Sequence, residues 1–163
     1  MKRDQFVTAL ETFFKGPRPY RHLYVWHGEA DDLMSLLPAG RARALNLFQV
    51  ATELNRHPLA RDEANELLHD ALRLQLRDWY AGGAKAHPVL VATGCELLAR
   101  YQVGLQPFYE VLTDYSMIIL VCSAEDAAYD PKGRLPGYVR CEPGATLTYL
   151  SRLVEDNHVI EAS

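Results

Sequence analysis

The chain has 163 residues, of which 48% are apolar or aromatic and 23% are charged. These are the proportions of a globular domain with its own hydrophobic core, and they argue against a disordered chain. The net charge of −4 gives no electrostatic reason to expect nonspecific binding to nucleic acid or acidic lipid. The three cysteines are too few and too scattered for a disulfide framework or a zinc site. No apolar run approaches the roughly 20 residues that span a bilayer. The start of the chain is unlike a signal peptide, so we expect a reducing cytoplasm.

The first third of the chain predicts two helices and a strand. Residues 4–15 have an apolar helical face, with Asp4 as its N-cap, and the prolines at 17 and 19 end this helix. Residues 22–26 form a short aromatic and aliphatic run that indicates a strand. Polar residues 27–32 interrupt it, and a short helix over 33–37 follows, ending at Pro38.

The middle of the chain predicts a strand over 42–48 that runs directly into a helix, and then the longest helix, over 61–80. On the long helix we expect Asp70 to pair with Arg73 or Arg77. Its apolar face is predicted to be wide and to comprise Leu67, Leu68, Ala71, Leu72, Leu74, Leu76, Trp79 and Tyr80.

Two apolar runs, 89–92 and 117–122, predict strands that are buried on both faces of a sheet. The first ends at Thr93-Gly94, and helical patterns over 95–101 and 105–112 fill the interval, as in a parallel βαβ unit. A long polar loop over 123–137 follows, and loops of this length are often functional.

The C-terminal residues predict a β-hairpin. The alternating segment 146–153 is its first strand, Glu155-Asp156-Asn157 its turn, and 158–160 its second strand. We therefore expect a single α/β domain over 1–163, with three layers, a mixed and mainly parallel sheet, and this hairpin at one edge.

Thr93-Gly94-Cys95-Glu96 joins a predicted strand to a helix, as nucleotide-binding turns do. Neither GxxxxGK[ST] nor GxGxxG is present, and Glu96 would repel a phosphate at that helix end. We favour a tight structural turn and expect no cofactor. A nucleotide held there without hydrolysis is an alternative. Cys95, close to a helix N-terminus, is a candidate nucleophile, but Glu96 works against a thiolate.

His27, Glu29, Asp31 and Asp32 follow the first predicted strand, at the edge where open α/β sheets bind ligands. An imidazole and carboxylates could hold a divalent metal, with Glu125 or Asp126 adding a ligand. This gives one functional hypothesis, a metal-dependent hydrolase or nuclease. A solvated loop that caps a helix explains the same residues.

Glu155-Asp156-Asn157-His158 offers acid and base groups as a second cluster. A turn between two strands favours Asp and Asn for local reasons, and we prefer that explanation.

One stretch is more specific than these clusters: Pro136-Gly137-Tyr138, followed by Leu147-Thr148-Tyr149-Leu150-Ser151-Arg152-Leu153-Val154-Glu155-Asp156-Asn157. Together with the strand that ends at Thr93-Gly94, it resembles the C-terminal part of the BrxB family of BREX (bacteriophage exclusion) systems. The family motif residues matched here are Thr93, Gly94, Pro136, Gly137, Arg152, Asp156 and Asn157. His158-Val159-Ile160 departs from the family's closing aromatic pair and arginine.

The resemblance implies a cytoplasmic, non-catalytic adaptor or scaffold of a prokaryotic anti-phage complex. It also implies a domain related to P-loop proteins that lacks the phosphate loop. Such a subunit would act through protein–protein contacts, notably with a PglZ-like protein. On this hypothesis an apolar surface patch and the 123–137 loop would meet the partner.

Overall fold

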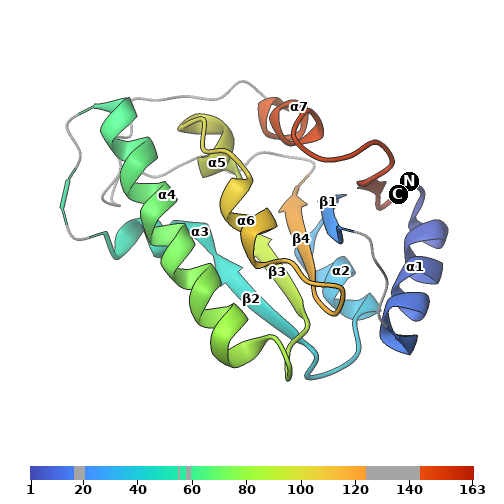
Figure 1. The fold of residues 1–163 in the computed structure, drawn as a ribbon. Helices are drawn as coiled ribbons and strands as arrows, with labels where there is room; N and C mark the ends of the chain where they lie inside the picture. Colours follow the sequence, from blue (N-terminus) through green and yellow to red (C-terminus); the bar gives the residue numbers. More distant parts are fainter. Residues whose placement is uncertain (17–20, 55, 58–59, 124–143) are drawn as a thin grey trace.

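Five strands form one sheet in the order β2-β3-β4-β1-β5, and every pair is parallel (Figure 1). The computed structural model describes residues 1–16, 21–54, 56–57, 60–123 and 144–163. The strands are β1 Leu23–His27, β2 Ala42–Asn46, β3 Val89–Thr93, β4 Met117–Cys122 and β5 Val159–Glu161. The three central strands β3, β4 and β1 are buried along almost their whole length. This confirms that the continuous apolar runs are strands covered on both faces.

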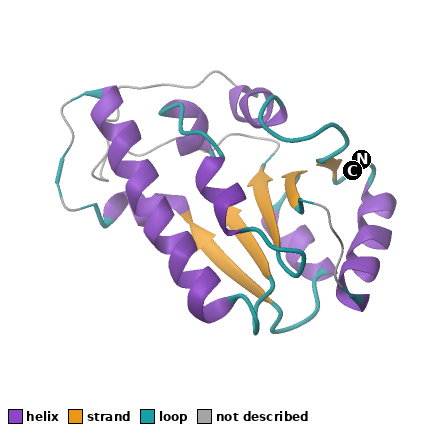
Figure 2. Cartoon of the chain, in the orientation of Figure 1, coloured by secondary structure: helices purple, strands orange, loops and turns teal. Residues whose placement is uncertain are grey.

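Helices cover both faces of the sheet and give three layers (Figure 2). The helices α1 Arg3–Lys15 and α2 Ala30–Leu36 pack on one face. The other face is covered by α3 Leu47–Thr52, α4 Arg61–Asp78, α5 Glu96–Arg100, α6 Gln106–Val111 and α7 Ala145–Ser151. A π-helical turn, Trp79–Gly83, extends α4. The three-layer α/β architecture agrees with the prediction.

Alternate residues of a strand pack against the helices on opposite faces of the sheet. On β1, Tyr24 and Trp26 pack with Phe6 of α1, whereas Leu23 and Val25 belong to the larger cluster under α3 to α7. This follows from the period of two along a strand.

Two helix details differ from the prediction. The N-cap of α1 is Lys2, whose backbone N–H donates to the Gln5 side chain at 2.9 Å, so Asp4 lies in the first turn instead. The buried stripe of α4 is narrower than expected and consists of Ala64, Leu68, Leu72 and Leu76. Leu74 and Tyr80 were predicted in this stripe but are 66% and 55% exposed.

The expected pairing of Asp70 within α4 is also wrong, because Arg73 pairs instead with Glu110 of α6 at 3.0 Å. This contact ties two helices together, which a pattern confined to one helix cannot predict.

The predicted C-terminal hairpin is wrong. Residues 145–151 form the helix α7, and β5 pairs in parallel with β1, Ile160 lying opposite Trp26. The described residues thus contain a wholly parallel sheet, not a mixed one. Thr146 and Leu150 are the fully buried residues of α7, and a spacing of four puts residues on one side of a strand or of a helix. The alternating pattern over 146–153 was therefore compatible with a strand and with a helix.

Most of the predicted 123–137 loop, including Pro136 and Gly137, lies outside the described residues. Among the residues that are described, no helix combines the length and the apolar character needed to cross a membrane.

Candidate functional site

The connections of the sheet mark one place where ligands bind in this class of fold. After β1 the chain crosses to β2, the strand at one side of the sheet. After β4 it crosses in the opposite direction to β5, the strand at the other side. Right-handed crossovers then put the following helices on opposite faces, as observed for α2 and α7. The crevice outside the carboxyl ends of β1 and β4, at His27 and Cys122, is the topological switch point.

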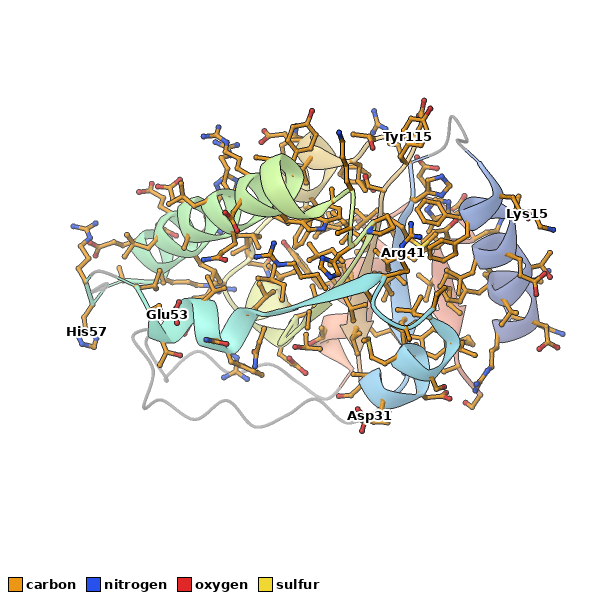
Figure 3. The ribbon with its side chains drawn as sticks, turned by 90° about the horizontal axis from the view of Figure 1, so that it is seen from below. Lys15, Asp31, Arg41, Glu53, His57 and Tyr115 are labelled. Carbon is orange, nitrogen blue, oxygen red and sulfur yellow. The ribbon has the colours of Figure 1, made fainter. Side chains whose placement is uncertain are left out.

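The acidic loop at this point does not converge on a common centre. The His27 Nδ1 atom lies 2.7 Å from a carboxylate oxygen of Glu161, and Asp32 pairs with Arg3 at 2.9 Å. The Glu29 carbonyl accepts a hydrogen bond from the Trp26 indole at 3.0 Å. Asp31 points outward from α2 (Figure 3). Of the four predicted ligands, His27 and Asp32 thus pair with different residues, whereas the side chains of Glu29 and Asp31 are exposed.

Within the described ranges, no group of three or more His, Cys, Asp or Glu side chains is placed to hold a metal ion. Glu125 and Asp126, the additional ligands considered above, lie outside those ranges.

Gly28 shows how closely the switch point is packed. A Cβ atom at this position would collide with the Cβ of Ala162 and would lie 3.1 Å from the Trp26 indole nitrogen. The Ala162 N–H donates to the His27 carbonyl at 3.2 Å, and the Gly28 N–H donates to the Cys122 carbonyl at 3.0 Å. These bonds use backbone groups that could otherwise face a ligand.

The Thr93-Gly94 turn has a structural explanation. Gly94 has φ +74°, and a Cβ there would lie 3.0 Å from the Phe48 backbone nitrogen at the start of α3. A side chain would thus be strained by the backbone and crowded by its neighbour. The Phe48 N–H already donates to the Asn46 side chain at 3.0 Å. Gly94 therefore lets the turn after β3 pack against the turn after β2.

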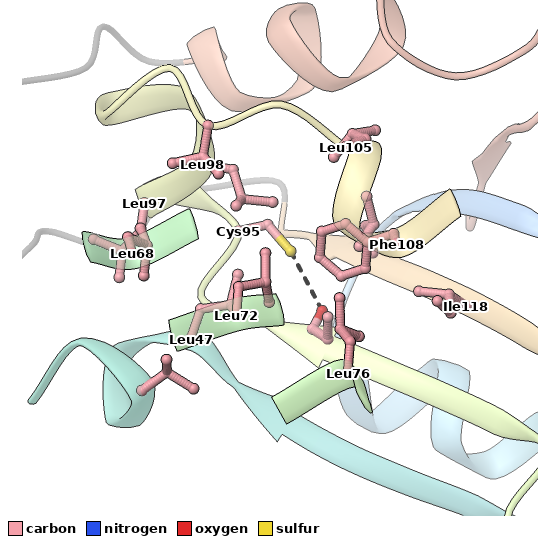
Figure 4. Close-up of a cluster of buried hydrophobic side chains, with 14 of the residues drawn as sticks. Leu47, Leu68, Leu72, Leu76, Cys95, Leu97, Leu98, Leu105, Phe108 and Ile118 are labelled. Carbon is pink, nitrogen blue, oxygen red and sulfur yellow. Dashed lines mark hydrogen bonds between the residues drawn. The ribbon is translucent and has the colours of Figure 1, made fainter. Parts of the chain in front are cut away.

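Cys95 is fully buried in the larger hydrophobic cluster, with its thiol bonded to the Ala92 carbonyl at 3.4 Å (Figure 4). Burial raises the pKa of the Cys95 thiol well above its usual value, and the nearby Glu96 and Cys122 raise it further. A nucleophile needs the opposite shift and access to substrate. Cys95 is therefore a core residue.

The residues of the C-terminal motif shape the entry to β5. Arg152 and Asp156 are exposed, and Asn157 has φ +68°. The His158 N–H closes a turn on the Glu155 carbonyl at 3.1 Å. The His158 ring stacks on Tyr24, and its Nδ1 lies 2.9 Å from the Leu23 carbonyl. The cluster thus forms a turn, but one that joins the helix α7 to β5 and not two strands as predicted.

A site that the sequence did not predict lies at the other end of the strands from the switch point, beside the amino ends of the central strands. This hollow, the amino-edge pocket, has a volume of about 670 Å³. Its lining is Phe13, Phe14, Gly16, Arg41, Tyr80, Ala81, Ala84, Lys85, Pro88, Thr113, Tyr115 and Ser116. These residues come from four separate parts of the chain, so no local motif announces the pocket.

No protein-family model matches this chain, and no curated protein or solved structure is significantly similar to it.

Proposed function

We propose that the chain is a non-catalytic adaptor or scaffold subunit of a prokaryotic anti-phage complex. The proposal takes its biological context from the resemblance of residues 93–94, 136–138 and 147–157 to the BrxB family. Its partner on this proposal is a larger protein of the PglZ type, met through protein–protein contacts in the cytoplasm.

The non-catalytic part of the proposal is supported by the contacts that polar side chains make at the switch point. Polar side chains at this edge are engaged in contacts within the fold: His27 with Glu161, Asp32 with Arg3, and Asn46 with the Phe48 amide. A catalytic centre instead needs acid, base or metal-binding groups that face one reacting atom. Within the described residues, no three His, Cys, Asp or Glu side chains are placed to hold a metal ion at this point, which agrees with the proposal.

The fold is also proposed to be related to P-loop domains without their phosphate loop. In favour of this, β1 lies at the switch point and leads to a helix on the face opposite α3 to α7. Only Gly28 and Glu29 separate β1 from α2, too few for GxxxxGK[ST]. Acidic Glu29, Asp31 and Asp32 at the beginning of α2 would oppose a phosphate.

A complementation experiment separates the adaptor from the hydrolase or nuclease alternative. The gene is deleted from its native operon, and phage plating is compared after return of the wild type or of the double variant Glu29→Gln/Asp31→Asn. Both side chains are exposed and form no ion pair with a described residue, so the variant removes charge with little effect on the fold.

The adaptor proposal predicts that deletion abolishes protection and that the double variant restores it as well as the wild type does. Full protection without the gene would overturn the proposal. Loss of protection by the folded double variant would favour the metal-dependent enzyme.

A further inference from the structure

Among the described residues that line the amino-edge pocket, the charged ones are Arg41 and Lys85, and none of these described lining residues is a carboxylate. Neither cation forms an ion pair with a described residue. The Arg41 guanidinium instead lies over the Phe14 ring, 5.6 Å from its centroid. In a chain of net charge −4, this is a local positive site that attracts an anion.

The same pocket exposes large aromatic surface. Tyr80 and Tyr115 line it and are 55% and 67% exposed, the latter the highest value among the large exposed hydrophobic residues described. Figure 3 looks at the fold from below and labels Arg41, which precedes β2, and Tyr115, whose side chain projects outward. Tyrosine and arginine are enriched where proteins meet partners.

Hydrogen bonds between side chains and the backbone hold the two sides of the pocket in place. On one side, the Trp79 indole donates to the His87 carbonyl at 2.8 Å, which fixes the segment carrying Tyr80 and Lys85. On the other side, the Thr113 N–H donates to the Ser116 hydroxyl at 2.9 Å, and the Tyr115 N–H donates to the Thr113 hydroxyl at 3.2 Å.

The Met117 N–H then joins the two sides by donating to the Pro88 carbonyl at 2.8 Å. A pocket ordered before binding loses less conformational entropy when it is occupied.

We propose that the amino-edge pocket docks an acidic peptide segment of a partner protein. A carboxylate of that segment lies between Arg41 and Lys85, and a neighbouring apolar or aromatic side chain packs on Phe13, Phe14 and Pro88. The volume of about 670 Å³ fits one such side chain with its flanking backbone. The inference deepens the proposed adaptor function, because it names the surface and the chemistry through which the partner is bound.

The test is selection of peptides from a random-sequence display library against the purified full chain, with the affinity of the selected peptides measured afterwards. We expect enrichment of sequences in which Asp or Glu adjoins an aromatic or aliphatic residue. Arg41→Glu or Lys85→Glu should weaken a selected peptide at least about tenfold, which corresponds to about 1.4 kcal/mol. Higher salt should weaken it as well.

Arg61→Glu is the matched control, because it makes the same charge change at an exposed site at the other end of α4. It should leave the affinity within about twofold. Arg41→Gln, which removes the charge without reversing it, serves if a reversed variant fails to fold, and it should also weaken binding.

The inference would be overturned by no enrichment of acidic peptides, by selected peptides that are basic or uncharged, or by unchanged affinity in the folded Arg41 and Lys85 variants. Small aromatic carboxylates such as benzoate binding in place of any peptide would also overturn it. The adaptor proposal fails separately, by full phage protection without the gene. A partner that is recovered equally well by the Arg41→Glu/Lys85→Glu variant leaves the adaptor role standing and removes this site.

Discussion

The His158 ring lies face to face with the Tyr24 ring, with centroids 4.6 Å apart and planes inclined by 25°. The same imidazole reaches the Leu23 carbonyl at 2.9 Å, so one side chain fastens the entry of β5 to β1. This contact adds to the parallel ladder between β5 and β1, to the bonds that Met1 makes with Val159 and Glu161, and to the burial of Ile160. Val25 completes the junction, because its N–H donates to the His158 carbonyl at 2.8 Å.

His158→Ala should lower the free energy of unfolding by about 1–2 kcal/mol, because it removes a ring pair and a hydrogen bond that is half-buried. Urea unfolding followed by circular dichroism measures this. The control is His57→Ala at an exposed position, for which we expect a change within about 0.5 kcal/mol. Equal stabilities of the two variants would show that the stacking does not hold β5.

Stability should fall at alkaline pH, in part through Tyr24. Burial raises the pKa of its hydroxyl above the ordinary value of 10.0, and Glu155 adds to the shift. The folded state therefore holds the proton more tightly than the unfolded state does. This contribution is complete below pH 10 and is lost as the pH rises through the pKa of the folded state.

Tyr24→Phe should make the fall in unfolding free energy above pH 10 shallower than in the wild type. Burial also raises the pKa values of Tyr109 and Tyr149, so part of the alkaline loss should remain in the Tyr24 variant. Identical slopes for the wild type and Tyr24→Phe would contradict this assignment.

Gly94→Ala should destabilise the protein by about 1–3 kcal/mol, because alanine is strained at positive φ and its Cβ would press on the Phe48 amide. Gly82→Ala is its control, since nothing lies within 4 Å of a Cβ at that glycine. We expect the control to change stability by less than about 1 kcal/mol. A Gly94→Ala variant as stable as the control would mean that the turn after β3 does not need glycine.

Cys95 should resist alkylation until the chain unfolds, because its thiol is buried and its raised pKa leaves little thiolate. Iodoacetamide labelling with peptide mapping locates the modification in the native protein and in urea. Rapid labelling of Cys95 in the native protein would restore the nucleophile hypothesis that the packing argues against.

The strands β3 and β4 were predictable because they carry short, unbroken β-branched and aliphatic runs, such as Met117–Cys122, which are typical of a strand buried on both faces. Gly94 likewise marked the turn after β3, whereas the strand predicted over 42–48 ends at Asn46, where α3 begins. The pairing of β5 was not predictable, because its partner β1 lies more than 130 residues earlier, and no local pattern encodes that distance. α7 was missed because its two buried residues, Thr146 and Leu150, fit both periods.

For the candidate site, too, the sequence predicted one part and missed another. The sequence pointed to the acidic loop after β1, where polar residues adjoin each other in the chain, yet the fold directs them to Glu161, Arg3 and solvent. Arg41 and Lys85 were not predicted as site residues, because they are far apart in the sequence and belong to no local motif. They share a pocket only because β2 and β3 are neighbours in the sheet.

The adaptor proposal is tested most directly by purifying the tagged chain from cells that express its native operon and identifying what accompanies it. The account predicts stoichiometric recovery of a larger defence protein of the PglZ type, and the Arg41→Glu/Lys85→Glu variant should lose most of it while Arg61→Glu retains it. Recovery of the folded chain alone, in an operon whose other products have no part in phage defence, would contradict the account.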